Sequence, residues 1–294
     1  MDLTGSICAL ATPFTADGVL DLAAWTRLLE HQIAGGTQAV VVAGSTGEAH
    51  ALDAGEYDRL LDAAVQTVAG RIPVVAGTGT ANTRKTVIAT QRARALGADA
   101  ALVVTPYYVR PPQEGLRRHY LAVADDGGLP VIAYNVPGRT GCNMQPETVA
   151  AIASHPHIIG IKEACSDVGR VEALLALRSD TFRVLSGDDG SCARSMLVGV
   201  DGVISVANNA FPHHYRRLCD FARGGQRDET EALDHALHPL ADLLGVESNP
   251  IPLKWCLHVL GICGPHLRLP LLCLSEAHRE PLRRVVDALR AAGA

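Results

Sequence analysis

The sequence predicts an α/β protein, a (β/α)8 TIM barrel with a C-terminal helical appendage. Short apolar, β-branched runs alternate with helical patterns along the first three quarters of the 294 residues. Continuous apolar strands of this kind are typical of a parallel sheet buried on both faces, and eight such strand–helix units close into a barrel. Beyond about Gly224 the pattern changes to helices alone.

The strands expected from these runs are, in chain order, Ser6–Leu10, Ala39–Ala43, Pro73–Ala76, Ala100–Thr105, Pro130–Tyr134, Ile158–Ile161, Phe182–Leu185 and Gly202–Val206. A doubly wound open sheet is the main alternative fold. It is disfavoured because no GxGxxG follows the first strand, and because polar clusters follow many strands rather than meeting at one crevice.

Helix-start signals occupy the segments between these strands. Asp21, Asn82 and Asp167 are side chains that cap helix N-termini, and Pro146 and Pro212 suit the first helical turn. Such signals at regular intervals support the alternation of strand and helix.

The last part of the chain is expected to form three helices, Gln226–Leu244, Pro252–Leu260 and Ser275–Ala292. No linker rich in Gly, Ser or Pro separates them from the barrel, so they should pack on it. The expected division is a catalytic barrel domain over residues 1–224 and a helical region over residues 225–294 packed on that barrel.

Composition excludes several classes of function. With 48% hydrophobic and 19% charged residues the chain can bury a large core. A net charge of −5 with only 4% aromatic residues argues against a nucleic-acid surface, so a small-molecule partner is expected. The N-terminus lacks a cationic segment leading into an apolar one, and no apolar stretch approaches the ~20 residues that span a membrane, which predicts a cytoplasmic protein.

Cysteine and histidine spacing gives no sign of a metal centre. The eight cysteines include no CxxC pair and the twelve histidines no HExxH motif. Buried reduced thiols and surface or capping histidines are therefore expected, with no metal site.

Lys162 is the most informative single residue. It lies in the apolar run Ile158–Ala164, in a chain whose only other lysines are Lys85 and Lys254. A desolvated ammonium loses its proton easily, and the neutral amine can attack a carbonyl carbon to form a Schiff base. A strand-end lysine paired with Glu163 or extending to water is the alternative. This segment alone leaves both interpretations open.

Polar clusters follow the expected strands, where barrel enzymes carry their reactive groups. Glycines in Gly44–Glu48 allow a tight turn that can present N–H groups to an anion, although such a loop can also be a helix cap. A phenol can relay a proton and an arginine can bind a carboxylate bidentately, although each is often structural when alone. The clusters would converge on one mouth, which predicts an active site there; they are Gly44–Glu48, Thr105–Tyr108, Tyr134–Thr140, Lys162, Ser186–Asp189 and Ser205–Asn208.

These motifs, in this order, resemble the dihydrodipicolinate synthase (4-hydroxy-tetrahydrodipicolinate synthase) family of class I pyruvate-dependent aldolases. The resemblance runs essentially from end to end. N-acetylneuraminate lyase and keto-deoxy-sugar aldolases share the barrel, the lysine and the GxTGE loop, but Arg139 within Tyr134–Gly141 favours the synthases. The segments that carry the resemblance are Thr4–Ser6, Thr12–Phe14, Gly44–Glu48, Gly77–Gly79, Thr105–Tyr108, Tyr134–Gly141, Gly160–Ala164, Ser186–Asp189, Gly202–Val206 and Asn249–Lys254.

The resemblance implies a catalytic set. Lys162 would form a Schiff base with pyruvate. Tyr134, Ser45 and Tyr108 would form a proton relay, with Tyr108 supplied by a neighbouring subunit. Ser45 stands where many synthases have threonine, so the hydroxyl is kept but its rotamer is less restrained.

The resemblance also implies a substrate-binding set. Thr46, with main-chain N–H groups of its loop, would hold the pyruvate carboxylate. Arg139 would bind the carboxylate of L-aspartate 4-semialdehyde, and Gly187 and Ile204 would line the pyruvate pocket.

The implied reaction is the first committed step of lysine and diaminopimelate biosynthesis, catalysed by a lyase that needs no metal or organic cofactor. The implied assembly is a homo-oligomer, at least a dimer and by resemblance a homotetramer. Around the family's allosteric pocket, the cation of Lys85 would repel a lysine ammonium, so inhibition by lysine is expected to be weak or absent. The alternatives are a related aldolase acting on a keto-deoxy sugar acid or on N-acetylneuraminate, and a non-catalytic binding barrel, which fits the motifs poorly.

Overall fold

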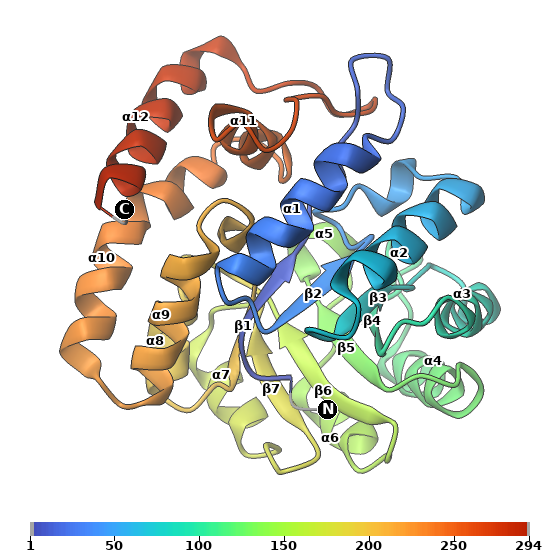
Figure 1. The fold of residues 1–294 in the computed structure, drawn as a ribbon. Helices are drawn as coiled ribbons and strands as arrows, with labels where there is room; N and C mark the ends of the chain where they lie inside the picture. Colours follow the sequence, from blue (N-terminus) through green and yellow to red (C-terminus); the bar gives the residue numbers. More distant parts are fainter. Residues whose placement is uncertain (1–2, 293–294) are drawn as a thin grey trace.

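A computed structural model describes residues 3–292 and contains a closed barrel of eight parallel strands within that range (Figure 1). Each strand pairs with the next, and β8 pairs with β1 from Gly5–Gly202 to Cys8–Ser205, which closes the ring. This confirms the predicted TIM barrel. The strands are β1 Gly5–Ala9, β2 Ala39–Val42, β3 Val74–Gly77, β4 Ala100–Val104, β5 Val131–Asn135, β6 Ile158–Glu163, β7 Arg183–Ser186 and β8 Gly202–Ser205.

Helices surround the barrel and extend from one side of it (Figure 1). Asp21, Asn82 and Asp167 each accept a main-chain hydrogen bond from the first turn of the helix that follows, as expected from the sequence. The elements are α1 Leu22–Ala34, η1 Ala49–Ala51, α2 Ala54–Val68, α3 Thr83–Ala95, α4 Gln113–Asp126, α5 Pro137–Thr140, α6 Pro146–Ala153, α7 Val168–Leu175, α8 Cys192–Leu197, η2 Ala207–Asn209, α9 Pro212–Arg223, α10 Arg227–Leu244, α11 Ile251–Val259 and α12 Glu276–Ala292.

The strands bury side chains on both faces. Val41 points into the barrel, where it packs with Ile7 and Ile132. Its neighbours Val40 and Val42 belong to the larger core between the strands and the helices. Successive strand residues point to opposite faces, so two buried faces require a continuous apolar run. This is why the strands lack the apolar–polar alternation of a half-exposed sheet.

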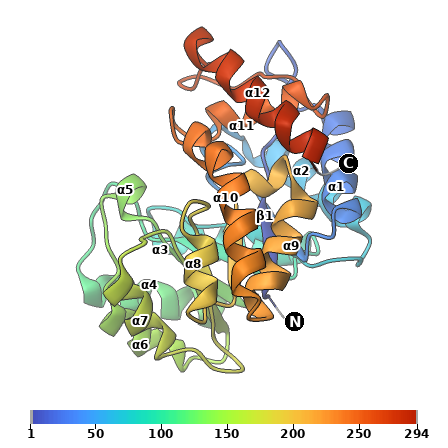
Figure 2. The ribbon, with the colours of Figure 1, turned by 90° about the vertical axis from the view of Figure 1, so that its left-hand side faces the viewer.

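The C-terminal helices pack against the barrel. Helix α10 lies along α8 and α9, and α12 lies across α10 and α11 (Figure 2). Helix α11 also contacts η2, which follows β8. The segment between α10 and α11 therefore reaches the end of the barrel where the strands finish.

Pairing between β5 and β6 places two key residues side by side. The register shifts between Val131 and Ile132, whose partners on β6 are Ile158 and Gly160, so Ile159 is bulged out of the ladder. On the other side of β6, a Cβ on Gly160 would lie 2.5 Å from the carbonyl oxygen of Arg183 in β7, so only glycine fits where these two strands pair. After the bulge, Tyr134 is directly beside Lys162.

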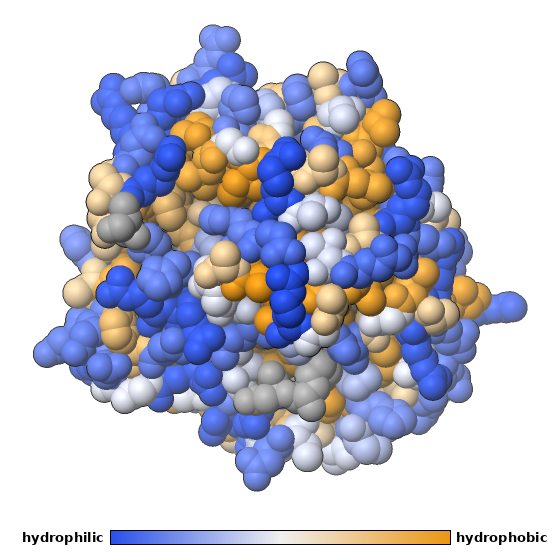
Figure 3. Space-filling model, viewed as in Figure 1, coloured by the Kyte–Doolittle hydropathy of each residue, from blue (hydrophilic) through white to orange (hydrophobic). Residues whose placement is uncertain are grey.

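The face seen in Figure 3 is mostly hydrophilic, with apolar areas scattered between charged side chains. Among the helices of residues 3–292, none is both long enough and apolar enough to cross a lipid bilayer.

Candidate active site

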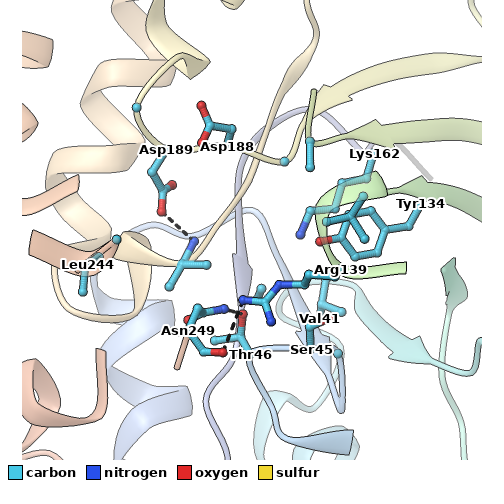
Figure 4. Close-up of a pocket in the computed structure, with 18 of the residues that line it drawn as sticks. Val41, Ser45, Thr46, Tyr134, Arg139, Lys162, Asp188, Asp189, Leu244 and Asn249 are labelled. Atoms are coloured by element: carbon cyan, nitrogen blue, oxygen red, sulfur yellow. Dashed lines mark hydrogen bonds between the residues drawn. The ribbon is translucent and has the colours of Figure 1, made fainter. Parts of the chain in front are cut away.

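A pocket of about 230 Å³ opens at the carboxyl ends of the strands (Figure 4). Its walls come from the loops after β2 and β7, from β5 and β6, and from α10 and the segment that follows it. Six of the eight site residues predicted from the sequence line it: Ser45, Thr46, Tyr134, Arg139, Lys162 and Gly187.

The Lys162 amine is held inside this pocket by β6. The residue is only 4% exposed, and burial lowers the pKa of the amine to about 8; the charge of Asp189 works against this shift, and that of Arg139 adds to it. Glu163 lies on the opposite face of the strand and forms an ion pair of 2.7 Å with Arg170. The alternative pairing of Lys162 with Glu163 is therefore not made.

Tyr134 lies against the lysine. The Lys162 Nζ is 4.4 Å from the centre of the phenol ring, and both side chains extend into the same cavity (Figure 4). Burial raises the pKa of Tyr134 to about 12, although the Arg139 charge and a hydrogen bond with Ser45 partly oppose that rise. The phenol is therefore protonated at neutral pH and can act as a proton donor beside the amine.

The loop after β2 is tightly folded. Ala43 and Glu48 have positive φ values of 54° and 50°, and the Thr12 hydroxyl donates a 2.6 Å hydrogen bond to the Gly47 carbonyl. A Cβ on Gly77 would lie 2.2 Å from the Ala43 carbonyl oxygen, so glycine is required where β3 passes this loop. The packing places the Thr46 hydroxyl at the pocket wall, where the residue is 3% exposed.

Arg139 stands at the entrance. It belongs to α5, the single helical turn that begins at Pro137, and its Nη2 donates to the main-chain oxygen of Asn249 at 3.3 Å. The pocket continues past Arg139 into a second cavity of about 430 Å³, which also contacts Tyr107. Arg139 therefore lines both the inner pocket and the second cavity.

Asp189 was not assigned a role from the sequence, yet it lines the pocket across from Lys162 (Figure 4). Its Oδ2 accepts hydrogen bonds from the main-chain N–H groups of Val206 and Ala207, at 3.0 and 2.8 Å. Burial raises the pKa of its carboxyl. The pair Asp188-Asp189 after an expected strand was the available signal, but only the fold turns Asp189 toward the lysine.

Asn249 is a second pocket residue to which the sequence assigned no role. It lines the pocket, and its Nδ2 donates to the Thr46 Oγ1 at 3.0 Å. The sequence showed Asn249 only as the start of an Asn-Pro-Ile-Pro motif. Nothing local connects that motif to a loop about 200 residues earlier, since only tertiary packing joins them.

Gly187 and Ile204 have different positions. A Cβ on Gly187 would lie 2.9 Å from the Cε of Lys162, so glycine leaves room for the lysine side chain. Ile204 is fully buried in the barrel interior with Leu185 and does not line the pocket.

Tyr108 lies outside the pocket of its own chain. It is 91% exposed, and its positive φ of 73° turns the backbone where its N–H donates to the Thr140 carbonyl oxygen at 3.2 Å. Within one chain the structure brings Ser45 and Tyr134 together but not Tyr108.

A family model described as the Dihydrodipicolinate synthetase family matches residues 2–289. A protein of Xanthomonas axonopodis pv. citri named 4-hydroxy-tetrahydrodipicolinate synthase is 62% identical over 290 residues, which cover 98% of this chain and 96% of that protein. One of the same name from Methylococcus capsulatus is 47% identical, with 99% of each chain covered.

Solved structures of similar proteins have the same fold. Dihydrodipicolinate synthase from Acinetobacter baumannii, a chloride-inhibited enzyme solved with pyruvate, superposes with a TM-score of 0.95 at 42% identity over 97% of this chain and 98% of that chain. A structure described as the first monomeric dihydrodipicolinate synthase variant gives a TM-score of 0.94 at 40% identity over 97% and 96%.

Proposed function

Because the chain belongs to the dihydrodipicolinate synthetase family, we propose that Lys162 is the nucleophile with which it carries out that family's reaction. The activity is that of a 4-hydroxy-tetrahydrodipicolinate synthase, a lyase that condenses pyruvate with L-aspartate 4-semialdehyde in lysine and diaminopimelate biosynthesis. The observation that carries the assignment of Lys162 is a buried amine, with its pKa lowered to about 8, whose Nζ lies 4.4 Å from the ring centre of a protonated phenol.

The first half of the reaction loads pyruvate. The neutral Lys162 amine attacks the ketone carbon, and the resulting carbinolamine loses water as Tyr134 supplies a proton to the departing hydroxyl. The product is an iminium, which draws electrons from the adjacent methyl group. Loss of one methyl proton then gives an enamine, with Ser45 and Tyr134 as the proposed path for the proton.

The second half uses the enamine as a carbon nucleophile. It attacks the aldehyde carbon of the semialdehyde, whose oxygen takes up a proton and becomes a hydroxyl, and the iminium forms again. The amine of the bound substrate then attacks the imine carbon, closes a six-membered ring and releases Lys162 as a free amine. The lysine itself supplies the electron sink, so the reaction proceeds without an added cofactor.

Thr46 and Arg139 are the proposed carboxylate ligands. Thr46 is at the inner wall and would hold the pyruvate carboxylate, while Arg139 is at the entrance and would bind that of the semialdehyde. A guanidinium binds a carboxylate with two parallel N–H donors, which fixes its orientation as well as its position. Gly187 is proposed to line the pyruvate site, and Ile204 to support it from the barrel interior.

The proposal extends to the assembly. Tyr108 is exposed on its own chain, which is the position expected of a residue that completes the relay in a neighbouring subunit. We therefore propose a homo-oligomer, at least a dimer and by family resemblance a tetramer, that acts in the cytoplasm. Residues 1–224 are proposed as the catalytic barrel domain, with residues 225–294 as a helical region packed on the barrel.

Reductive trapping tests the nucleophile. Pyruvate plus borohydride should add one reduced pyruvyl group to the wild-type chain, at Lys162, as located by peptide mass spectrometry. Lys162→Arg keeps the positive charge but cannot form the imine, so it should show no adduct and no turnover in a coupled assay with reductase. Turnover by Lys162→Arg, or an adduct at Lys254, would exclude Lys162 as the nucleophile.

A further inference from the structure

Asn249 touches both groups that are proposed to bind substrate carboxylates. Its side-chain Nδ2 donates to the Thr46 Oγ1 at 3.0 Å, and its main-chain oxygen accepts from the Arg139 Nη2 at 3.3 Å (Figure 4). Thr46 follows β2 and Arg139 follows β5, whereas Asn249 comes from the C-terminal region. One residue thus joins the inner and outer parts of the site.

The direction of the hydrogen bond to Thr46 matters. A hydroxyl has one proton to donate and two lone pairs that accept. Because Asn249 donates, the Thr46 oxygen uses a lone pair and keeps its proton. Among residues 3–292, no hydrogen bond has the Thr46 hydroxyl as its donor. That proton is therefore available to an anion in the pocket, which is what a bound carboxylate requires.

The side-chain oxygen of Asn249 is a second indication that a ligand binds here. The Asn249 Oδ1 is buried and has no hydrogen-bond partner among the described residues. A buried acceptor without a donor destabilises the fold, so such a group calls for a specific explanation. A substrate bound between Thr46 and Arg139 can supply a donor, such as the ammonium of the semialdehyde.

We propose that Asn249 is a positioning residue for both substrates. Its side chain aims the Thr46 proton at the pyruvate carboxylate, and its main-chain oxygen holds the Arg139 guanidinium for the second carboxylate. The inference rests on the proposed function, because it assumes that Thr46 and Arg139 hold those two groups.

Two substitutions of Asn249 test whether its side chain serves pyruvate while its main-chain oxygen serves the semialdehyde. Asn249→Ala removes the donor to Thr46 but keeps the carbonyl that binds Arg139, so the KM for pyruvate should rise about tenfold and the KM for the semialdehyde about threefold or less. Asn249→Asp should raise the pyruvate KM more than Asn249→Ala does. The new carboxylate would accept the hydrogen bond of the Thr46 hydroxyl, which is then lost to the substrate, and it would repel the substrate anion. Val246→Ala, in the same segment but outside the pocket, should leave both constants unchanged.

A double-mutant cycle decides whether Asn249 acts through Thr46. In a Thr46→Val background the hydroxyl is gone, so adding Asn249→Ala should leave the pyruvate KM unchanged. Additive effects, or equal increases in both KM values for Asn249→Ala, would overturn the inference. The cycle decides the question even if Asn249→Asp fails to fold.

Borohydride trapping on the wild type keeps the two proposals apart. A wild type that forms no pyruvyl adduct contradicts the proposed function. A wild type that forms the adduct and turns over, combined with Asn249 variants whose KM values are unchanged, contradicts the role of Asn249 alone.

Discussion

Burial of a single amine governs the chemistry of the pocket. Lys162 carries a side chain long enough to reach water, yet β6 and the neighbouring Tyr134 keep it 4% exposed. Desolvation disfavours the charged form, which is why the pKa falls from 10.5 to about 8. With that pKa, about one-tenth of the amine is neutral at pH 7, where an ordinary lysine has far less.

The pH dependence of imine formation follows from that pKa. Only the neutral amine attacks pyruvate, so the trapping rate at low pyruvate should rise with pH through a midpoint near 8 and level off above it. The rate of adduct formation, followed by mass spectrometry from pH 6 to about 10.5, gives the midpoint. A midpoint close to 10.5, the ordinary lysine value, would contradict a desolvated amine.

Arg139 should act on one substrate and not on the other. Arg139→Ala removes the donor pair for the semialdehyde carboxylate, and a charge-assisted hydrogen bond contributes about 1.5–3 kcal/mol. The KM for the semialdehyde should therefore rise by roughly ten- to a hundredfold, with a much smaller change for pyruvate. Steady-state kinetics with each substrate varied in turn measure both values. Equal increases for the two would contradict the assigned partner.

At the scale of elements, a buried ion pair ties the loop after β2 to α11. The Nζ of Lys254 lies 2.6 Å from the Oε1 of Glu48, and both side chains are fully buried. Lys254 also donates to the His266 carbonyl oxygen at 2.8 Å and lies 4.3 Å from the centre of the Phe14 ring. The loop that carries Thr46 is thus anchored to the C-terminal region by charge as well as by Asn249.

Breaking that pair should destabilise the fold. Lys254→Met leaves the Glu48 carboxylate buried without its cation, which costs about 3–5 kcal/mol. Urea unfolding should show this loss, and the double variant Lys254→Met with Glu48→Gln should recover part of it. The matched control is Lys85→Met, at an exposed lysine, for which the unfolding free energy should change by less than about 0.5 kcal/mol. No loss in Lys254→Met would show that the pair adds nothing to stability.

Sequence periodicity located the strands to within a residue or two, because a strand buried on both faces is recognisable from its own residues. Strand six was expected to end at Ile161, but β6 continues to Glu163. The bulge at Ile159 was not predicted, because it depends on how β6 pairs with β5. Asp189 and Asn249 were not assigned for a related reason, because contacts between distant segments give their side chains a role.

At the scale of the whole molecule, the position of Tyr108 bears on whether the active enzyme needs more than one subunit. One chain alone leaves the proposed relay without its third hydroxyl, because this phenol is 91% exposed and lies outside the pocket. Because one similar solved structure is described as a monomeric dihydrodipicolinate synthase variant, the number of subunits should be measured directly. Sedimentation or light scattering of the wild type should give a mass of at least twice 31.0 kDa.

Subunit mixing tests whether Tyr108 crosses to a neighbour. Tyr108→Phe and Lys162→Arg should each be nearly inactive alone. Unfolded together and refolded, they form hybrids in which a chain with Lys162 receives Tyr108 from a chain that lacks that lysine, so activity should reappear. If Tyr108 served its own chain, no hybrid would contain a complete site, and the mixture would stay inactive. The two variants refolded separately and then combined are the control.

The wall formed by Ala241, Leu244, Gly245 and Asn249 has a consequence for biosynthesis of the enzyme itself. A ribosome delivers Lys162 and Tyr134 well before it delivers these residues. A nascent barrel can therefore complete its ring of strands, which ends with β8 at Ser205, before these wall residues are synthesised. The pocket is complete only after they have been added, so catalytic competence requires the C-terminal region as well as the barrel.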